Sequence, residues 1–254
     1  MKLTIDGKEC AAKQGETLLE VAGRNGIEIP TLCYHKALEA RGACRLCLVE
    51  IRNPDWPGWK KLVTACVYPA KDGLEVQTRS DEILQVRRTL IELLLARCPE
   101  TAEVQALARE YGIEQTSYAK REQDDNCILC GMCARVCEDV IGVSAIGPYG
   151  RGMYKQIGPA FDKAAEACVG CGACAHVCPT NCIQVIDEGL TRRIPRWHVE
   201  FELVPCRICG KPVSTRKHID FVRSRIAVGP EVLETCSECL REHYGGKIAA
   251  EGHM

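Results

Sequence analysis

The first eighty residues alternate between apolar and polar positions over short segments. Leu3 and Ile5 alternate with polar neighbours, and the dipeptide Asp6-Gly7 that follows is a strong hairpin turn. Thr17 opens a capping box, which predicts one short helix that ends by Gly26. The pattern therefore predicts a compact, β-rich domain. Its further strand-like runs are expected at residues 46–51, 62–67 and 74–78.

From residue 80 onward the apolar positions recur with the period of a helix. Ser80 is suited to an N-cap, and a broad apolar stripe follows it as far as Leu95. A second run with one apolar side begins after Thr101 and stops at Gly112. Since amphipathic helices ordinarily bury such stripes, these two runs predict a helical connector. A later helix is expected at residues 233–243, followed by a disordered tail from Gly245.

Composition changes this picture, because 19 of the 254 residues are cysteine and only 5% are aromatic. The N-terminus lacks the apolar segment of a signal peptide, and the longest apolar run, residues 90–96, is too short to span a bilayer. A formal net charge of −1 favours neither nucleic acid nor an anionic membrane as a partner. We therefore expect a cytoplasmic protein whose cysteines bind metal and replace part of a conventional core.

The strongest motif is C-x2-C-x2-C-x3-C, which occurs twice and closes the second time with Cys178-Pro179. This is the spacing of two-cluster ferredoxins, in which the fourth cysteine of each run reaches the other cubane. Disulfides and zinc are the alternatives, but nothing indicates secretion, and zinc sites rarely show this run in tandem. The crossed arrangement assigns one 4Fe–4S cluster to Cys127, Cys130, Cys133 and Cys178, and the second to Cys137, Cys168, Cys171 and Cys174.

Four earlier cysteines are spaced C-x10-C-x2-C-x18-C, and they are Cys33, Cys44, Cys47 and Cys66. Their order resembles a plant-type ferredoxin, in which a loop presents three thiolates and a later strand returns the fourth. The longer first gap shifts the resemblance toward the 2Fe–2S domain of respiratory complex I and its relatives, whose cluster loops the segments 30–35 and 42–50 resemble closely. A structural zinc could use the same ligands, but the resemblance favours a 2Fe–2S cluster.

The C-terminal quarter carries two C-x2-C knuckles, the first followed by Gly210. Cys206, Cys209, Cys236 and Cys239 resemble an all-cysteine zinc site, although four thiolates would also suit a 4Fe–4S cluster. Zinc is favoured, because such knuckles are typical of closed structural sites in small, poorly cored domains. The three cysteines left over are expected to be packing residues, and they are Cys10, Cys98 and Cys182.

Taken together, the order of parts over about residues 1–190 resembles a set of electron-transfer subunits. These are the N-terminal part of the complex I large iron–sulfur subunit, the small diaphorase subunit of NAD-linked nickel–iron hydrogenases, and the iron–sulfur subunit of electron-bifurcating hydrogenases and formate dehydrogenases. Such relatives usually carry one more 4Fe–4S cluster, held by one histidine and three cysteines. Here Cys98 falls near that histidine, and residues 100–111 lack the cysteines, so we expect that cluster to be absent. We also expect the catalytic site to lie on another chain.

The predicted fold class is α+β, in four parts. They are a β-grasp 2Fe–2S ferredoxin domain at residues 1–79, a helical connector at 80–118, a double 4Fe–4S ferredoxin domain at 119–190, and a four-cysteine zinc module with its tail at 191–254. No catalytic residue is predicted. The resemblance implies an electron relay between a flavin subunit that oxidises NAD(P)H and a catalytic metal subunit of hydrogenase or formate dehydrogenase type. The alternatives are a redox-sensing regulatory protein and a free-standing polyferredoxin.

Overall fold

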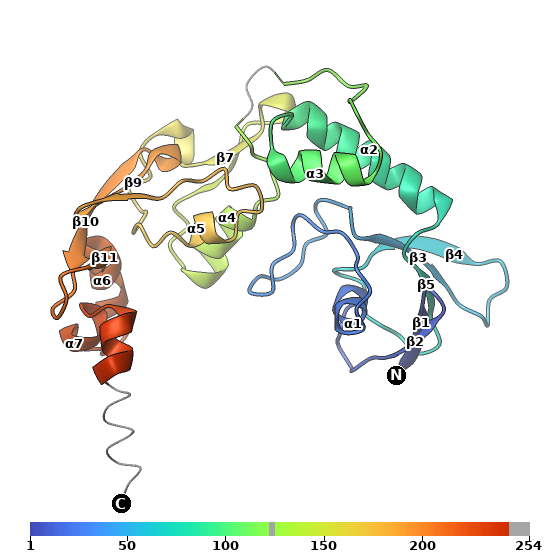
Figure 1. The fold of residues 1–254 in the computed structure, drawn as a ribbon, viewed down its shortest axis with the longest axis horizontal. Helices are drawn as coiled ribbons and strands as arrows, with labels where there is room; N and C mark the ends of the chain where they lie inside the picture. The colour runs from blue at the N-terminus through green and yellow to red at the C-terminus, as the bar shows by residue number, and fades with distance from the viewer. Residues whose placement is uncertain (122–124, 244–254) are drawn as a thin grey trace, which may run out of the picture. The chain divides into compact units, whose positions relative to one another are not determined.

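The structure is a computed structural model that describes residues 1–121 and 125–243 (Figure 1). The tail predicted from Gly245 lies outside these residues. The chain forms two compact units. The first comprises Met1–Met132 and Pro179–Cys182, and the second comprises Cys133–Cys178 and Ile183–Met254. Each unit combines helices with sheet, in agreement with the predicted fold class.

The first unit is built on a five-stranded sheet in the order β2-β1-β5-β3-β4, in which only β1 and β5 run parallel. The predicted Asp6-Gly7 hairpin is confirmed, since both residues have a positive φ and join β1 to β2. The Asp6 carboxylate also accepts hydrogen bonds from the backbone and hydroxyl of Thr78, at 2.8 and 2.6 Å. The strands are β1 (Lys2–Ile5), β2 (Lys8–Ala11), β3 (Leu48–Arg52), β4 (Lys60–Thr64) and β5 (Glu75–Gln77).

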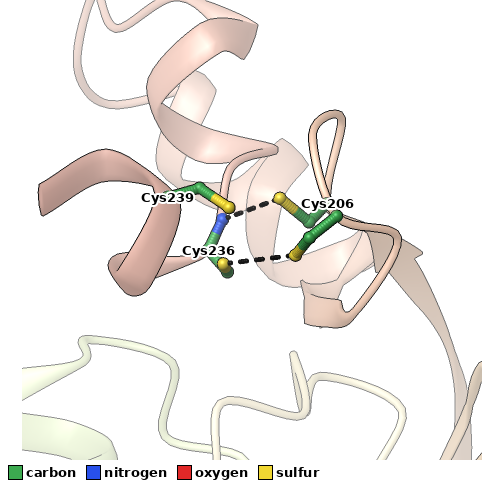
Figure 2. Close-up of side chains that lie close together, drawn as sticks. Cys206, Cys236 and Cys239 are labelled. Atoms are coloured by element: carbon green, nitrogen blue, oxygen red, sulfur yellow. Dashed lines mark hydrogen bonds between the residues drawn. The ribbon is translucent and has the colours of Figure 1, made fainter. Parts of the chain in front are cut away.

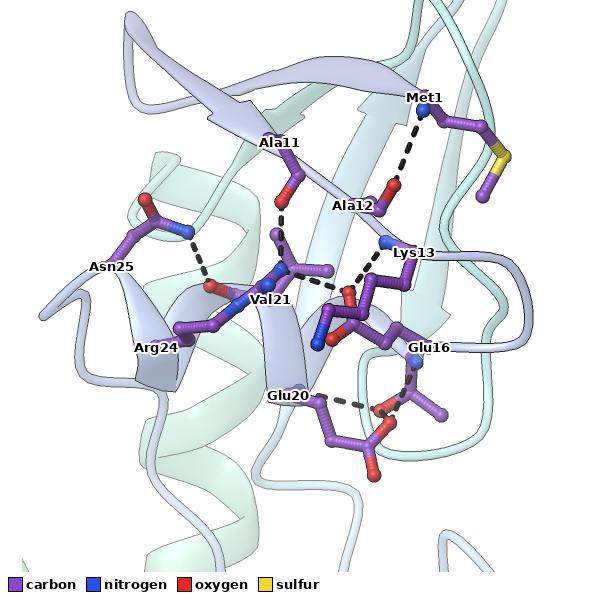
Figure 3. A network of polar contacts seen from close by, with 10 residues as sticks. Met1, Ala11, Ala12, Lys13, Glu16, Glu20, Val21, Arg24 and Asn25 are labelled. Carbon is purple, nitrogen blue, oxygen red and sulfur yellow. Dashed lines mark hydrogen bonds and ion pairs between the residues drawn. The ribbon is translucent and has the colours of Figure 1, made fainter.

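Helix α1 (Leu18–Arg24) packs its buried Leu18 and Val21 into the core of this sheet. The predicted capping box is confirmed, because Glu20 N donates to the Thr17 hydroxyl and Thr17 N donates to the Glu20 carboxylate. Figure 3 shows how Arg24 fixes the end of the helix to the segment that precedes it. Its Nη2 donates to Ala11 O at 2.7 Å and to the Glu16 carboxylate at 2.8 Å.

The predicted helical stripes form a second core in the same unit. Helix α2 (Asp81–Arg97) begins at Ser80, whose hydroxyl accepts a hydrogen bond from Ile83 N, and α3 (Ala102–Glu110) follows it. The N-cap Thr101 makes no side-chain cap; its hydroxyl donates to Asn126 instead. The stripes pack together with Leu46, which lies in the loop before β3. Within the described ranges, no helix is both long and apolar enough to cross a bilayer.

The second unit contains a hairpin of two short strands and a four-stranded antiparallel sheet in the order β11-β10-β9-β8. Its strands are β6 (Gly147–Tyr149), β7 (Gln156–Gly158), β8 (Ile186–Glu188), β9 (Thr191–Ile194), β10 (Val199–Pro205) and β11 (Pro212–Thr215). Its helical segments are a π-turn at Val136–Val140, 3-10 turns at Gly152–Tyr154, Ala160–Asp162 and Pro195–Trp197, and α5 (Ala173–His176), α6 (Arg216–Arg223) and α7 (Pro230–Leu233). The short helix α4 (Met132–Arg135) starts at the last residue of the first unit.

The helix predicted at residues 233–243 is wrong in its first part. Helix α7 starts earlier, at Pro230, and ends at Leu233; helical conformation resumes only at residues 237–243. Proline at the first position favours the earlier start. The break has a physical reason, because Cys236 N donates to the sulfur of Cys206 at 3.3 Å and is not used for a helical hydrogen bond.

Candidate iron–sulfur and metal sites

The first set of cysteines meets at one end of the β3–β4 pair. Leu48 pairs with Thr64 in the strand register, and Ala65 N donates to Cys47 O at 3.0 Å. Since Cys47 directly precedes β3 and Cys66 follows β4, this pairing brings the two cysteines together. The loop before β3 supplies the other two, and Cys44 N donates to the sulfur of Cys33 at 3.2 Å.

The four thiols of this set influence one another as two pairs, Cys33 with Cys44 and Cys47 with Cys66. Hydrogen bonding by the Cys33 thiol lowers the pKa of Cys44 to about 6, and hydrogen bonding by the Cys66 thiol lowers the pKa of Cys47 to about 7. Thiolate is the form that binds metal. Two pairs of sulfurs suit a cluster of two irons, because each iron takes two thiolates, whereas a single zinc ion needs all four sulfurs around one point.

A second set of cysteines lies wholly within the second unit. Cys137, in the π-turn, and Cys168, Cys171 and Cys174 line one hollow. Apolar side chains form most of its other walls, and they are Ile141, Val143, Ile146, Val169, Ile194 and Trp197. Residues 141–146 belong to the segment between the two cysteine motifs, so this segment covers part of the hollow. This hollow brings together all four ligands predicted for the second 4Fe–4S cluster.

Three N–H groups point at sulfur atoms in this hollow. Ala145 N donates to Cys137 at 3.3 Å, Gly170 N to Cys168 at 3.4 Å, and the Trp197 indole to Cys174 at 3.3 Å. Burial raises the pKa of Cys174 to about 11, so a thiolate there requires a compensating cation. Sulfur donors, N–H groups and apolar walls together fit an iron–sulfur cluster.

The remaining ferredoxin cysteines divide between the units. Cys127 and Cys130 belong to the first unit, and Cys133 and Cys178 belong to the second, so their common cluster stays a prediction. One observation in the first unit supports it. Arg97 donates through Nε to Cys127 O at 2.6 Å, and its buried Nη2 is the one such side-chain atom in the described ranges without a hydrogen-bond partner. Cluster sulfur would offer this donor an acceptor.

The C-terminal knuckles converge on a tight sulfur group (Figure 2). The sulfurs of Cys206, Cys209, Cys236 and Cys239 all lie within 4.8 Å of one another. Among the residues that the structure describes, this is the only such group of three or more possible metal ligands. The first knuckle joins β10 to β11, where Gly210 adopts a positive φ. Backbone N–H groups, that of Cys209 first, lower the pKa of Cys206 to about 6, which favours its thiolate.

Two of the leftover cysteines are packing residues, as predicted. Cys10 is 1% exposed in the core of the first sheet, and Cys98 is completely buried against α2 and α3. Cys182 is only half-buried, and its packing role stays a prediction.

The sequence analysis did not identify the side chains that hydrogen-bond to the backbone of residues 166–170, the loop around Cys168 (the second cluster loop). Arg192, on β9, donates to Gly170 O at 2.9 Å. Thr215 donates to Val169 O, and Lys217 to Glu166 O. These partners are separated by 22 to 51 residues, and no local motif signals them. Together they fasten β9, β11 and α6 to the segment that carries Cys168.

Comparison with known proteins agrees with these sites. Residues 1–81 match the family described as a 2Fe-2S iron-sulfur cluster binding domain. Residues 121–185 match the family described as a 4Fe-4S dicluster domain. Both matches end before β8, so they leave the four-cysteine module outside. The chain therefore contains ferredoxin-type domains of both kinds.

Similar full proteins are subunits of NAD(P)-linked oxidoreductases. The chain is 35% identical over 175 residues to the NADPH-Fe(3+) oxidoreductase subunit alpha of Geobacter sulfurreducens, covering 60% of this chain and 20% of that protein. It is 33% identical over 191 residues to the NADP-reducing hydrogenase subunit HndD of Solidesulfovibrio fructosivorans, covering 64% and 32%. It is 31% identical over 188 residues to the mitochondrial NADH-ubiquinone oxidoreductase 78 kDa subunit of Neurospora crassa, covering 64% and 25%.

The solved structures give the same answer. A crystal structure of NAD+-reducing NiFe hydrogenase in the H2-reduced state matches with a TM-score of 0.54 and 28% identity, over 63% of this chain and 74% of that one. The predicted resemblance to complex I and NAD-linked hydrogenase subunits is thus confirmed. The chain spans only about a fifth to a third of the length of these curated relatives.

Proposed function

We propose that this chain relays single electrons, through one 2Fe–2S and two 4Fe–4S clusters, between a flavin subunit that oxidises NAD(P)H and a catalytic metal subunit. The observation that carries the proposal is the pairing of two cysteine sets with two ferredoxin-type family matches. The similarity to a subunit of an NADPH-dependent oxidoreductase supports the link to NAD(P)H. The similarity to a hydrogenase subunit supports a catalytic partner of hydrogenase type. A catalytic partner of formate dehydrogenase type is the alternative to a hydrogenase within this proposal, and electron bifurcation and a cytoplasmic location are its further parts.

Twelve cysteines would hold the three clusters. Each bound cluster would accept and release one electron at a time at a potential set by its surroundings. The ligands would be Cys33, Cys44, Cys47 and Cys66 for the 2Fe–2S cluster, Cys127, Cys130, Cys133 and Cys178 for one 4Fe–4S cluster, and Cys137, Cys168, Cys171 and Cys174 for the other. The β-grasp topology and the boundaries 1–79, 80–118, 119–190 and 191–254 complete the proposed architecture.

Side chains of this chain would set the reduction potential of the second 4Fe–4S cluster. The apolar wall of Ile146, Ile194 and Trp197 would exclude water. The N–H groups of Ala145, Gly170 and Trp197 would stabilise negative charge on the sulfurs, and so favour the reduced state.

Anaerobic purification from the native source, with the co-purifying subunits retained, tests the relay. Addition of NADH or NADPH should bleach the visible absorbance of this chain's clusters through the flavin subunit. Cys66→Ala should remove the 2Fe–2S signal and slow the reduction. Cys10→Ala is the matched control, since Cys10 is equally buried but lies outside the ligand set. A native complex whose clusters stay oxidised with both nucleotides contradicts the relay.

For the C-terminal module we propose a structural zinc ion. Zn–S bonds of about 2.3 Å put the sulfurs of a tetrahedral site about 3.8 Å apart, which agrees with a group that lies within 4.8 Å. A 4Fe–4S cubane binds each thiolate through a different iron, so the four cysteine sulfurs would lie further apart than they do around one zinc ion. Metal analysis should find one zinc ion per chain, and Cys236→Ala should lose it without any loss of iron. Additional iron and sulfide that disappear in this variant would instead indicate a fourth cluster.

A further inference from the structure

Helix α2 carries a buried cation beside the 2Fe–2S site. Arg87 is 1% exposed, although arginine is almost never fully buried unless it is paired. Its Nε donates to Leu46 O at 2.9 Å and its Nη2 to Leu48 O at 2.8 Å. These two carbonyls flank Cys47, so the guanidinium bridges the backbone on both sides of a predicted iron ligand.

No carboxylate balances this charge in the described ranges. The third partner of Arg87 is a neutral group, the Tyr111 hydroxyl, at 3.5 Å. Glu50, the buried carboxylate of β3, is engaged by Arg52 at 2.7 Å and by Lys60 at 3.4 Å. A buried charge without an opposite charge is strongly unfavourable, and carbonyl dipoles offset only part of that penalty.

A 2Fe–2S cluster bound by Cys47 would supply the missing negative charge. Four thiolates, two sulfides and two ferric ions carry a net negative charge, and reduction adds one more electron. We propose that Arg87 is the counter-charge of the 2Fe–2S cluster, and that it raises the cluster's reduction potential by stabilising the reduced state. Arg87 is therefore a positioning and tuning residue with no catalytic role. The inference rests on the 2Fe–2S ligand set and is independent of the partner that supplies the electrons.

The competing explanation is that Arg87 only ties α2 to the loop before β3. The reduction potential of the cluster distinguishes the two roles. A purely structural contact would change the stability of the protein, whereas a counter-charge would change the reduction equilibrium of the cluster. Arg88 is the matched control, since it is the next residue of α2 but is exposed. The variants are Arg87→Met, Arg87→Gln and Arg87→Lys, each compared with Arg88→Met.

The test is an anaerobic redox titration of the full chain, followed by the electron paramagnetic resonance signal of the reduced 2Fe–2S cluster. Arg87→Met and Arg87→Gln should lower the reduction equilibrium constant about tenfold, which equals about 59 mV for one electron. Arg87→Lys, which keeps the charge, should stay near the unmodified chain, and Arg88→Met should not shift. An Arg87→Met protein that assembles the cluster and titrates like Arg88→Met overturns the proposal, as does an equal shift in Arg87→Lys and Arg87→Gln.

Failure to assemble the cluster is also decisive. If the neutral variants hold no 2Fe–2S cluster while Arg87→Lys holds a full complement, the site requires a positive charge, as proposed. If Arg87→Lys holds none either, the shape of the guanidinium and its two carbonyl bonds matter more than its charge, and the proposal is wrong. None of these outcomes depends on electron transfer from NAD(P)H, so a failure of the relay would be seen separately.

Discussion

Gly170 offers a sharp test of how closely the C-terminal sheet packs on the second cluster loop. It lies between Cys168 and Cys171 with φ +70°, and a Cβ added there would lie 2.7 Å from Phe201 Cδ2 and 2.7 Å from Thr215 Cγ2. Thr215 is completely buried and donates to Val169 O, so it has little room to move away. We expect Gly170→Ala to loosen this loop and release the second cluster.

The expected loss of stability in Gly170→Ala follows from two separate effects. A left-handed backbone costs about 1–2 kcal/mol for a residue with a side chain, and forcing an extra carbon into a packed region costs about 1–3 kcal/mol. Gly189 is the control, because it has a similar φ of +60° but nothing within 4 Å of the added Cβ. Gly189→Ala should therefore cost about 1–2 kcal/mol, and Gly170→Ala about 2–5 kcal/mol.

Thermal bleaching of the cluster absorbance, at one heating rate under anaerobic conditions, measures the difference. For a chain of this size, 1 kcal/mol corresponds to about 2–4 °C. Gly170→Ala should therefore lose its colour about 2–12 °C below Gly189→Ala, and it should lose sulfide with the iron. Equal midpoints for the two variants would show that an added Cβ at residue 170 does not meet Phe201 and Thr215 in solution.

Two further predictions concern the same unit. Trp197→Phe removes the indole N–H that points at Cys174 Sγ. It should lower the midpoint potential of the second 4Fe–4S cluster by roughly 20–60 mV, the equivalent of about 0.5–1.4 kcal/mol. An unchanged potential would mean that this hydrogen bond does not form in the protein with its cluster bound. Burial, and then the charge of Arg192, lower the pKa of His218, so the unfolded chain binds a proton more readily, and stability should fall as the pH drops below about 6.5. Urea unfolding at pH 7.5 and 5.5 should show this loss in the unmodified chain and a smaller one in His218→Gln; identical pH dependence in both proteins would refute the assignment.

Local features of the structure could be predicted from the sequence. The Asp6-Gly7 hairpin, the Thr17 capping box and the start of α2 after Ser80 each depend on residues a few positions apart. The cysteine spacings predicted the four sulfurs of the C-terminal knuckles and the four cysteines that line the hollow of the second unit, because cluster and zinc ligands lie on short loops of fixed length. The set that includes Cys127 and Cys178 stays a prediction. Cys10 and Cys98 were identified as packing residues by elimination, and both are buried.

The contacts that shape the sites could not be predicted in this way. Arg87 lies 41 residues from Leu46, and Lys217 lies 51 residues from Glu166, so only the folded chain brings them together. In the sequence both side chains look like ordinary exposed charges. The break before residue 237 was missed for a related reason, because it depends on the distant sulfur of Cys206.

The division of the chain into units has a practical consequence for anyone who wishes to express its parts separately. Residues 179–182 belong to the first unit although their neighbours on both sides belong to the second, so the polypeptide passes between the units three times. A fragment truncated anywhere from 133 to 178 would lack this short return segment. Isolating the N-terminal half intact therefore calls for grafting residues 179–182 back through a linker, and a simple cut would leave that half incomplete.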